Sequence, residues 1–405
     1  MTPYEILWLI VLPIALASWF FFFRSRKGYI PEYDGLPPGP LPKIVFLIAT
    51  RKPSSIVQET INSINNACRG AGFTNYDIDV VADDEGVSLT GAQLILVPED
   101  YVCKSQFKAR ALNYSLKFLD NSKDVWILHK DEDSKIIPQT VISILHYIKN
   151  GGKPIANGPM MFPWDKNIFT FYLEAQRYWT FFWVKDQMRT GLVHWMNGSN
   201  MLMRSDIEHL IGWDFPNCPY SEDSRFAWEA GRKLGRVFGW HGGLTIEKPA
   251  KTFMSAMRQR RRWYAGWFFL LRYMYWRVWF YRSYSNVVWA SSFFLLVMAP
   301  LAWFGVYRND LFLLTGLTGG FITAMHWARP QVGLYYNLKF TKFSTTKKIL
   351  FHIGYVPFTW IIDFMNTFPT IWALVNPPKT FEITEKNMSE IPVEVEEKKL
   401  TGVGV

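Results

Sequence analysis

Four short apolar runs, each followed by polar residues, constrain the fold of this chain more than any other feature. The runs cover residues 44–49, 78–82, 94–97 and 124–128, and stretches with helical spacing separate them. Continuous apolar runs of this length are typical of strands that are buried on both faces of a parallel sheet. The alternation of such strands with helices therefore predicts an α/β domain.

Polar side chains directly follow three of these predicted strands. They are Thr50 and Arg51 after the first run, Asp83 and Asp84 after the second, and Asp131 and Asp133 after the fourth. In parallel α/β sheets, ligands bind beyond the carboxyl ends of the strands. We therefore expect these side chains to lie along one binding crevice. The sequence contains no glycine-rich phosphate loop, which favours a phosphate site made by a metal ion and side chains.

Asp131 and Asp133 form a D-x-D pair at the end of a buried-type strand. Two carboxylates one residue apart can hold a divalent cation, which then neutralises a substrate diphosphate. Oxygen ligands suit Mn²⁺ or Mg²⁺ rather than zinc. A solvated acidic turn is the alternative interpretation, and the strand before the pair leaves the two interpretations equally open.

Glu222 and Asp223 lie at the start of a further stretch with helical spacing. Acidic residues in a first helical turn often only stabilise the helix through its dipole, by about 0.3–1 kcal/mol. The functional interpretation is that one of them acts as a general base and takes a proton from an acceptor hydroxyl. Both interpretations remain open at the level of the sequence.

One glutamine, three arginines and one tryptophan occupy residues 259–263, directly before an aromatic stretch. A basic helix on a membrane surface has this composition. Arginine also binds diphosphates through its planar set of donors, and an indole face can stack on a sugar. The two interpretations are compatible with each other.

The order of these motifs resembles that of the cellulose-synthase-like membrane glycosyltransferases of family 2. Residues 108–113 (KARALN), the Gly198-Ser199 turn and residues 381–386 (FEITEK) are similar to three further motifs of that family, although Arg110 replaces a glycine and Ile383 a valine. The full Gln-Arg-Arg-Arg-Trp run and the modest membrane part look most like the egghead-type β-mannosyltransferases, which use GDP-mannose. The resemblance implies an α/β GT-A fold, the Rossmann-like fold of nucleotide-diphospho-sugar transferases.

The resemblance also implies a role for each motif. Asp223, with Glu222 beside it, would be the catalytic base. Asp131 and Asp133 would hold Mn²⁺ or Mg²⁺, with His241 as a possible further ligand or a loop histidine without such a role. Nucleotide and diphosphate contacts would come from Thr50, Arg51, Asp83, Asp84, Lys108, Arg110, Gln259 and Arg262. Acceptor contacts would come from Gly198, Ser199 and Trp263.

Residues 5–23 form a nearly unbroken apolar stretch. A helix needs about 20 such residues to cross a bilayer core of about 30 Å. Arg24, Arg26 and Lys27 follow at once, so we predict an anchor with its N-terminus outside and the catalytic domain in the cytosol. Residues 287–306 and 311–328 predict a transmembrane hairpin.

The last apolar stretch, residues 349–375, contains two prolines and two polar side chains: Pro357, Asp363, Asn366 and Pro369. A charged residue within the membrane is costly unless it faces protein or water. We therefore predict a broken helix that lies in the interface or re-enters the membrane, and about three spans in all. Four spans are the alternative.

The sequence then divides into seven parts. They are an anchor (1–28), a Pro/Gly linker (29–43), a GT-A domain (44–253), interfacial helices (254–286), a hairpin (287–328), a basic loop with an interfacial or re-entrant helix (329–375), and a gating-like motif with a polar tail (376–405).

Composition agrees with a membrane enzyme in a reducing compartment. Aromatic residues make up 17% of the chain and its formal charge is +10, which suits lipid headgroups and phosphorylated substrates rather than nucleic acid. The three cysteines show no pairing pattern. We predict an inverting transferase that moves mannose from GDP-mannose to a lipid-linked acceptor. A processive β-glycan synthase that uses a UDP-sugar and an inactive membrane scaffold are the alternatives.

Overall fold

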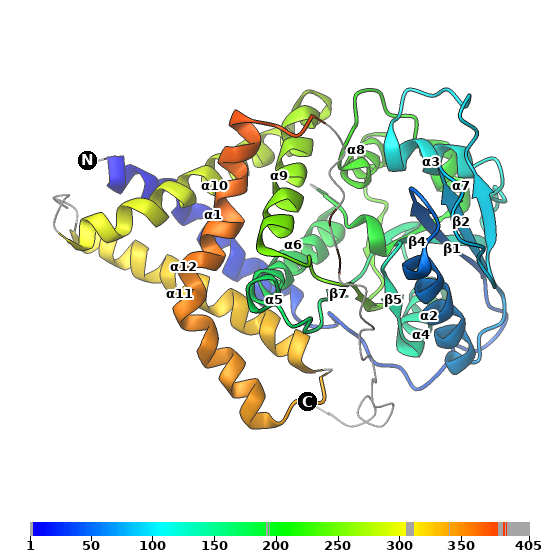
Figure 1. Cartoon of the computed structure of the whole chain (residues 1–405), viewed down its shortest axis with the longest axis horizontal. Coiled ribbons are helices and arrows are strands. Elements are labelled where there is room, and N and C mark those ends of the chain that lie inside the picture. The colour runs from blue at the N-terminus through cyan, green and yellow to red at the C-terminus, as the bar shows by residue number, and fades with distance from the viewer. Residues whose placement is uncertain are drawn as a thin grey trace. The chain divides into compact units, whose positions relative to one another are not determined.

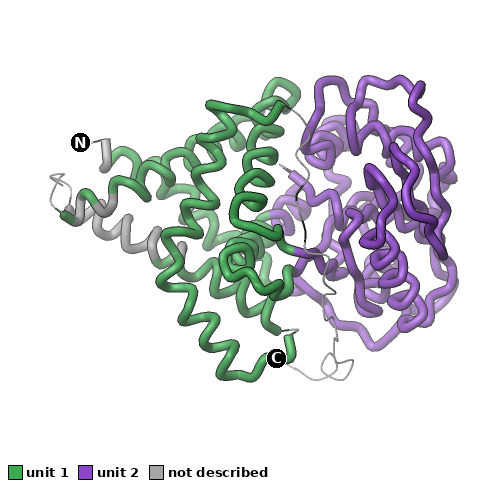
Figure 2. The backbone as a smooth tube through the Cα atoms, viewed as in Figure 1, with its two compact units in different colours: residues 1–26, 162–183, 249–391 green, residues 27–161, 184–248, 392–405 purple. Residues whose placement is uncertain are grey.

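The computed structural model describes residues 3–191, 193, 195–304, 312–339, 341–379, 384 and 386. The chain forms two compact units, coloured separately in Figure 2. Unit 1 contains residues 1–26, 162–183 and 249–391, and unit 2 contains residues 27–161, 184–248 and 392–405. We expected one continuous domain over residues 44–253, whereas the structure assigns the segment 162–183 to the other unit.

Unit 2 is an α/β unit built on a seven-stranded sheet (Figure 1). Its strands in that sheet are β1 (Lys43–Thr50), β2 (Tyr76–Ala82), β3 (Gln93–Leu96), β4 (Val125–Asp131), β6 (Ile155–Asn157), β8 (Met201–Arg204) and β9 (Phe238–Trp240). A small second sheet contains β5 (Lys135–Ile136), β7 (Met160–Met161) and β10 (Thr245–Ile246). The helices are α2 (Ser55–Ala71), α3 (Phe107–Ser115), α4 (Pro138–Lys149), the 3₁₀ turn η1 (Gly198–Asn200), α7 (Ser205–Ile211) and α8 (Glu222–Leu234).

The large sheet has the strand order β3-β2-β1-β4-β8-β6-β9 and is mixed. Strands β1 to β4 are parallel, as predicted, but β8 pairs antiparallel with both β4 and β6. The parallel pairing of the four predicted strands is therefore confirmed, and the antiparallel strand β8, which was not predicted, makes the whole sheet mixed. The reason lies in the approach to β8, whose first residue Met201 pairs with His129 near the carboxyl end of β4, so that the chain must run back along β4.

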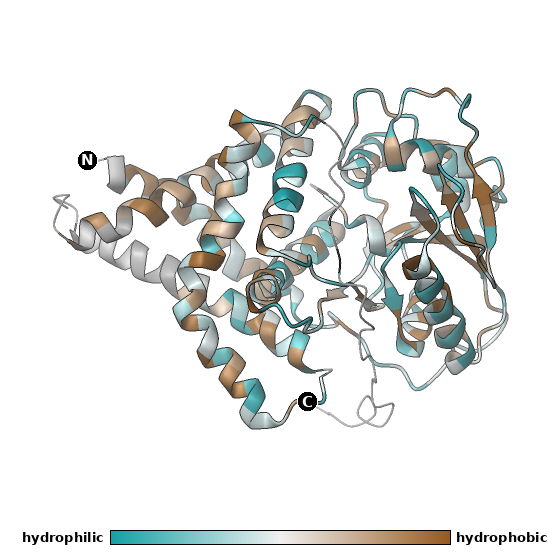
Figure 3. Cartoon of the chain, viewed as in Figure 1, coloured by the Kyte–Doolittle hydropathy of each residue, from teal (hydrophilic) through white to brown (hydrophobic). Residues whose placement is uncertain are grey.

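The core of unit 2 lies between the sheet and the helices α2 and α4. Every residue of β1 from Ile44 to Thr50 is buried, which explains the unbroken apolar run. Ile61 and Ile64 of α2 and Ile144 of α4 pack in the same cluster as the strands. Figure 3 shows the apolar colouring of the strands against the mixed surface of the helices.

The ends of the parallel strands meet at one edge of the sheet, as expected. Ala49 of β1 pairs with Asp131 of β4, and Thr50 pairs with Ala82 of β2. Strand β4 runs three residues beyond the predicted end at residue 128, so Asp131 is the last strand residue rather than part of the following turn. Thr50, Asp83 and Asp131 therefore lie at neighbouring strand ends.

Unit 1 is helical. Its elements are α1 (Pro3–Ser25), α5 (Ile168–Ala175), the beginning of α6 (Arg177–Thr190), α9 (Phe253–Leu270), η2 (Leu271–Tyr273), α10 (Trp276–Trp303), α11 (Phe312–Lys339) and α12 (Thr345–Val375). Helix α12 packs on α9 and α10, and α1 packs on α10 and α11. Tyr172 of α5, Leu334 of α11 and Tyr355 of α12 share one apolar cluster.

Two features of these helices differ from the prediction. Helix α12 continues through both Pro357 and Pro369, so the expected break between residues 349 and 375 is absent. A helix of 31 residues keeps enough neighbouring hydrogen bonds and packing to offset the two that the prolines remove. Helix α10 likewise continues across residue 287, where we placed the boundary between interfacial and membrane segments.

Among the described residues, one helix is long and apolar enough to cross a membrane. It is the segment Glu5–Ser25 of α1, with a mean hydropathy of 2.4. This agrees with a span or signal anchor near the N-terminus. The hairpin expected over residues 287–328 lies partly outside the described residues, and the count of three spans stays a prediction.

The contact between α11 and α5 generates a test of the fold. A Cβ atom on Gly333 would lie 1.8 Å from the backbone oxygen of Ala175, whereas one on Gly354 would meet only the Tyr172 hydroxyl, at 2.9 Å. We expect Gly333→Ala to lower the free energy of unfolding by about 1–3 kcal/mol through overpacking. Gly354→Ala is the control, because it gains the same helix propensity without a backbone clash. Equal melting temperatures for the two variants in detergent would contradict this packing.

Candidate functional site

Lys108 brings three of the predicted motifs together in unit 2. Its ammonium nitrogen lies 2.5 Å from Oδ1 of Asp131 and 3.8 Å from Oε1 of Glu222. Lys108 comes from the first turn of α3, Asp131 from the end of β4 and Glu222 from the start of α8. Three segments that are far apart in the sequence therefore converge on one cation.

Asp223 lies beside this cluster. Its Oδ2 accepts a hydrogen bond of 2.9 Å from the backbone N–H of Gly198, and its Oδ1 accepts one of 2.6 Å from Ser224. A Cβ atom on Gly198 would come within 3.3 Å of both Asp223 Oδ2 and Lys108 Nζ. Because Gly198 has no side chain, the Asp223 carboxylate and the Lys108 ammonium can approach the η1 turn closely.

The surroundings of Asp223 favour its neutral form more than water does. Burial and then the Glu222 carboxylate raise the pKa of Asp223 to about 7, while Lys108 acts in the opposite direction. Burial alone would lower the pKa of Lys108, but Asp131 and Glu222 outweigh it and raise that pKa. Asp223 therefore titrates near neutral pH beside a lysine that stays charged. This is the environment that tunes a carboxylate for proton transfer.

The two other strand ends hold their polar side chains in ion pairs. Arg110 Nη1 lies 2.7 Å from Asp83 Oδ1, and Arg51 Nε lies 3.4 Å from Asp84 Oδ2. Arg110 also donates a hydrogen bond to the backbone oxygen of Pro98, at 2.6 Å. The arginine that replaces the expected glycine is thus tied to Asp83, which leaves the exposed Arg51 and Asp84 better placed to contact a ligand.

Glu132, the middle residue of the D-x-D motif, was not among the predicted residues. Its Oε2 accepts a hydrogen bond of 2.6 Å from the Thr50 hydroxyl, and its backbone oxygen accepts one of 2.7 Å from Thr60. The first bond joins the end of β1 to the turn after β4, and the second joins that turn to α2. The pairing of adjacent parallel strands is the signal that could have identified this contact. The Thr50 hydroxyl therefore helps to hold the acidic turn, residues 131–133, in place.

The acidic turn fits a divalent cation that is shared with a substrate diphosphate. The side chain of Asp133 is buried and accepts a hydrogen bond of 3.3 Å from the backbone N–H of Lys248. Within the described part of the chain, no group of three or more His, Cys, Asp or Glu residues could hold a metal ion. Mg²⁺ and ions of its kind use one or two carboxylates and take their other ligands from phosphate and water. Two carboxylates, those of Asp131 and Asp133, are compatible with such a site, and their role as metal ligands stays a prediction.

His241 does not belong to the metal site. Its Nδ1 accepts a hydrogen bond of 3.0 Å from the Gly243 N–H, and its Nε2 lies 3.3 Å from the backbone oxygen of Asn200. Burial and the nearby Lys130 lower the pKa of His241 to about 3, although the contact with Asn200 acts in the opposite direction. A neutral ring with both nitrogens bonded to the main chain has no lone pair directed at a metal. These contacts favour the second of the two predicted alternatives, a loop histidine without a metal role.

The hydroxyl of Ser199 is also directed away from the cluster. Ser199 is buried, and its Oγ lies 3.7 Å from the Met160 sulfur. The Gly198-Ser199 turn contributes the backbone N–H of Gly198 to the site instead. A side-chain contact between Ser199 and an acceptor is thus not supported by the structure.

The three arginines of residues 259–263 have different surroundings in unit 1. Arg260 is buried and pairs with Glu174 at 3.3 Å. Arg261 donates a hydrogen bond of 2.7 Å to the backbone oxygen of Asn376. Arg262 and Trp263 are partly exposed. Figure 3 colours the middle of α9, which carries the run, as hydrophilic.

The gating-like motif lies largely outside the described residues. Of residues 381–386, the structure describes Thr384 and Lys386. Lys386 forms an isolated antiparallel bridge with Ala250, directly before α9.

Comparison with known proteins assigns the family. A family model described as "Glycosyl transferase family group 2" matches residues 126–370, which is more than half of the chain and includes parts of both units. The chain belongs to this family. The prediction of a family 2 glycosyltransferase is therefore confirmed, while the likeness to cellulose synthases in particular stays a prediction.

The chain is similar to two named mannosyltransferases of animals. It is 27% identical to "Beta-1,4-mannosyltransferase egh" of Drosophila melanogaster over 257 residues, which are 58% of this chain and 55% of that protein. It is 25% identical to "Beta-1,4-mannosyltransferase bre-3" of Caenorhabditis elegans over 240 residues, which are 56% of this chain and 52% of that protein. The chain thus spans about half the length of the curated relatives it matches.

A solved structure shares the fold. The mannosyltransferase PcManGT from Pyrobaculum calidifontis, in complex with GDP-Man and Mn²⁺, matches with a TM-score of 0.50 at 13% identity. The match covers 92% of this chain and 98% of that chain. Unit 2 therefore has a GT-A-like α/β fold of the nucleotide-sugar transferases, with a mixed sheet.

The backbone before Glu222 generates a test of the site. Ser221 adopts the left-handed conformation, with φ 60° and ψ 41°, at the residue where α8 begins. This conformation costs little for glycine and most for β-branched residues. We expect Ser221→Gly to keep or raise the melting temperature and Ser221→Val to lower the free energy of unfolding by about 1–3 kcal/mol. Equal stability of the two variants would show that the start of α8 is not held in this conformation.

Proposed function

We propose that this protein is an inverting mannosyltransferase that moves mannose from GDP-mannose to a lipid-linked acceptor. The observation that carries the proposal is the cluster of Lys108, Asp131, Glu222 and Asp223 in a family 2 glycosyltransferase. The similarity to mannosyltransferases of animals and of Pyrobaculum calidifontis supports mannose as the sugar. The Pyrobaculum enzyme was solved with GDP-Man and Mn²⁺ bound, which supports that donor and a divalent cation.

Asp223 is the general base in this proposal. It takes the proton of an acceptor hydroxyl, and the oxygen attacks the anomeric carbon from the side opposite the diphosphate. The bond from that carbon to the diphosphate breaks, and GDP leaves with the electron pair. The raised pKa of Asp223 keeps the carboxylate basic enough to accept this proton near neutral pH. The Gly198 N–H holds the carboxylate in place.

The donor would be held by the polar strand ends and by Lys108. Arg51, Asp84 and Asp83 lie at the ends of β1 and β2, where the nucleotide binds in folds of this class. A Mn²⁺ or Mg²⁺ ion held by Asp131 and Asp133 would supply positive charge to the leaving diphosphate. Gln259 and Arg262 would contact the diphosphate, and Trp263 the acceptor. Arg262 suits this role because its side chain is partly exposed and a guanidinium binds diphosphate through its planar set of donors.

The membrane would supply the acceptor. Helix α1 would anchor the chain with its N-terminus outside and unit 2 in the cytosol, since the basic residues Arg24, Arg26 and Lys27 follow the apolar segment. Partly or fully exposed aromatic side chains on α9 and α10, among them Phe269, Trp276 and Trp279, suit the headgroup layer. A lipid-linked sugar would reach Trp263 from that layer.

A donor screen tests the proposed function. The purified full chain in detergent is incubated with GDP-mannose, UDP-glucose or UDP-GlcNAc, with Mn²⁺ or with a chelator, and with a glycosylated lipid or a polyprenyl-phosphate glycan as acceptor. We expect a mannosylated lipid of inverted anomeric configuration from GDP-mannose, and no product with the chelator. Transfer from a UDP-sugar alone, or retention of configuration, would contradict the proposal.

Asp223→Asn is the matched variant for this screen, because it removes the base and preserves the size of the side chain. We expect turnover to fall by about 10²–10⁴-fold while donor binding is retained. Donor affinity is measured by titration calorimetry with GDP-mannose and Mn²⁺. Near-normal turnover with intact donor binding would exclude Asp223 as the base.

A further inference from the structure

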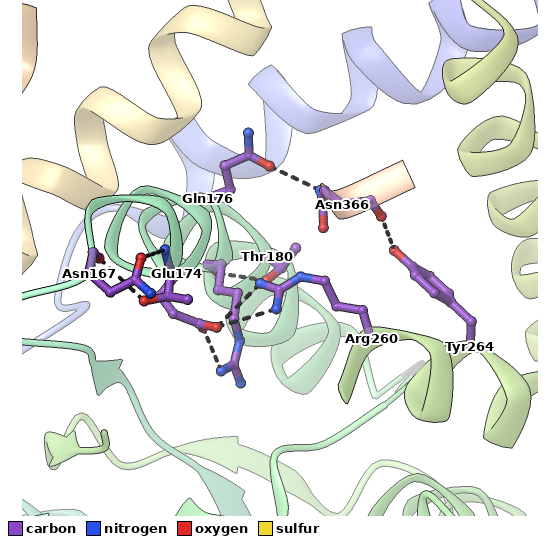
Figure 4. Close-up of polar contacts among 9 residues, drawn as sticks. Asn167, Glu174, Gln176, Thr180, Arg260, Tyr264 and Asn366 are labelled. Atoms are coloured by element: carbon purple, nitrogen blue, oxygen red, sulfur yellow. Dashed lines mark hydrogen bonds and ion pairs between the residues drawn. The ribbon is translucent and has the colours of Figure 1, made fainter. Parts of the chain in front are cut away.

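Glu174 is a buried carboxylate in α5 that binds two arginines. Its Oε2 lies 2.8 Å from Nη1 of Arg177, and its Oε1 lies 3.3 and 3.4 Å from the two terminal nitrogens of Arg260. Only 1% of its surface is exposed. Figure 4 shows that the carboxylate lies between the guanidinium of Arg260, which comes from α9, and a second guanidinium. Glu174 therefore connects α5 to the helix that carries residues 259–263.

Both of these arginines contact Trp263. The guanidinium carbon of Arg177 lies 4.8 Å from the centre of the Trp263 ring, and that of Arg260 lies 5.6 Å from it. Arg177 also lies 4.4 Å from the ring centre of Phe162. A guanidinium over an aromatic ring is attracted by the negative charge of the ring face. The orientation of the indole thus depends on two cations that Glu174 holds in place.

The surroundings of Glu174 favour its charged form. Burial alone would raise the pKa of Glu174, but Arg177 and Arg260 outweigh it and hold the pKa below its usual range. A buried carboxylate with two cationic partners is costly to break, because removal of any one partner leaves an uncompensated charge. The contact is therefore a fixed element of unit 1.

Helix α5 is itself held on both sides. Asn167 caps its start and donates a hydrogen bond to the backbone oxygen of Lys251, just before α9. At its other end, Gln176 donates hydrogen bonds to Tyr355 and Asp363 of α12. Figure 4 shows Asn167, Glu174 and Gln176 along this helix. A binding residue keeps a precise orientation only when the groups around it are themselves held in place, as α5 is here.

We propose that Glu174 is a positioning residue for the acceptor, and that it acts through Arg177 and Arg260 on the indole of Trp263. The proposal rests on the proposed function, in which Trp263 contacts the acceptor sugar. It explains why the first arginine of the run is buried: Arg260 orients the neighbouring tryptophan and does not bind the donor. It also adds two residues, Glu174 and Arg177, that lie outside every recognised motif of the chain.

The first experiment separates acceptor binding from donor chemistry. Glu174→Gln keeps the shape of the side chain and removes its charge. We expect the KM for the acceptor to rise at least tenfold, while hydrolysis of GDP-mannose without acceptor stays within about threefold of the original rate. Arg258→Gln is the control, since Arg258 is an exposed arginine of α9, the helix that carries residues 259–263, and this change likewise replaces one charged side chain by glutamine. We expect the acceptor KM and the rate of GDP-mannose hydrolysis of this variant to be unchanged.

The second experiment tests whether the effect passes through Trp263, and it does not depend on Glu174→Gln folding normally. Arg177→Lys keeps the positive charge beside Glu174 and loses the planar group that stacks on the ring. We expect this variant to keep its melting temperature and to raise the acceptor KM about fivefold. In a Trp263→Leu background, the same change should have no further effect, because the ring through which it acts is gone.

The outcomes distinguish a failure of the proposed function from a failure of the positioning role of Glu174. If the unmodified chain transfers no sugar in the donor screen, the proposed function fails. If it transfers sugar, and Glu174→Gln or Arg177→Lys lowers donor hydrolysis and transfer equally, the positioning role is wrong. Independent effects of Arg177→Lys and Trp263→Leu on the acceptor KM would also overturn it.

Discussion

The ion pairs of Lys108 are the interactions on which the cluster of Asp131, Glu222 and Asp223 depends. Asp131, Glu222 and Asp223 come from β4 and α8, and without a cation between them three carboxylates would repel one another. Lys108 compensates this repulsion and still leaves Asp223 with a raised pKa. The same cation therefore holds the D-x-D strand end beside the Glu-Asp helix and lowers the pKa of Asp223, against the larger effect of burial.

Unit 1 uses opposite charges in the same way. There a single buried carboxylate, Glu174, holds two arginines, and those arginines hold an indole. The side chains of the run at residues 259–263 thus have different surroundings. Arg260 and Arg261 fix the helix internally, whereas Arg262 and Trp263 remain partly exposed. A motif that looks like a uniform basic patch in the sequence contains both buried and partly exposed side chains.

The sequence predicted those parts of the molecule that depend on local pattern. The parallel strands and the polar residues at their ends follow from apolar periodicity, and Thr50, Asp83 and Asp131 lie together for that reason. The reversal at β8 could not be predicted, because four residues carry too little pattern to define a direction. The pairing of Glu174 with Arg260 joins residues 86 positions apart. The sequence left two roles open for His241, because its main-chain partners are visible only in the folded chain.

The dependence of kcat/KM on pH tests the central role of Lys108 most directly. In the unmodified enzyme, activity should fall as the pH drops below about 7, because Asp223 then becomes protonated. Lys108→Met removes the positive charge that lowers the pKa of Asp223. The acidic limb of the profile should therefore move to higher pH by about one unit, which corresponds to ~1.4 kcal/mol of charge interaction. Lys108→Arg, which keeps the charge, should leave the limb near its original position. A limb that stays in place, or moves to lower pH, in Lys108→Met would contradict the account.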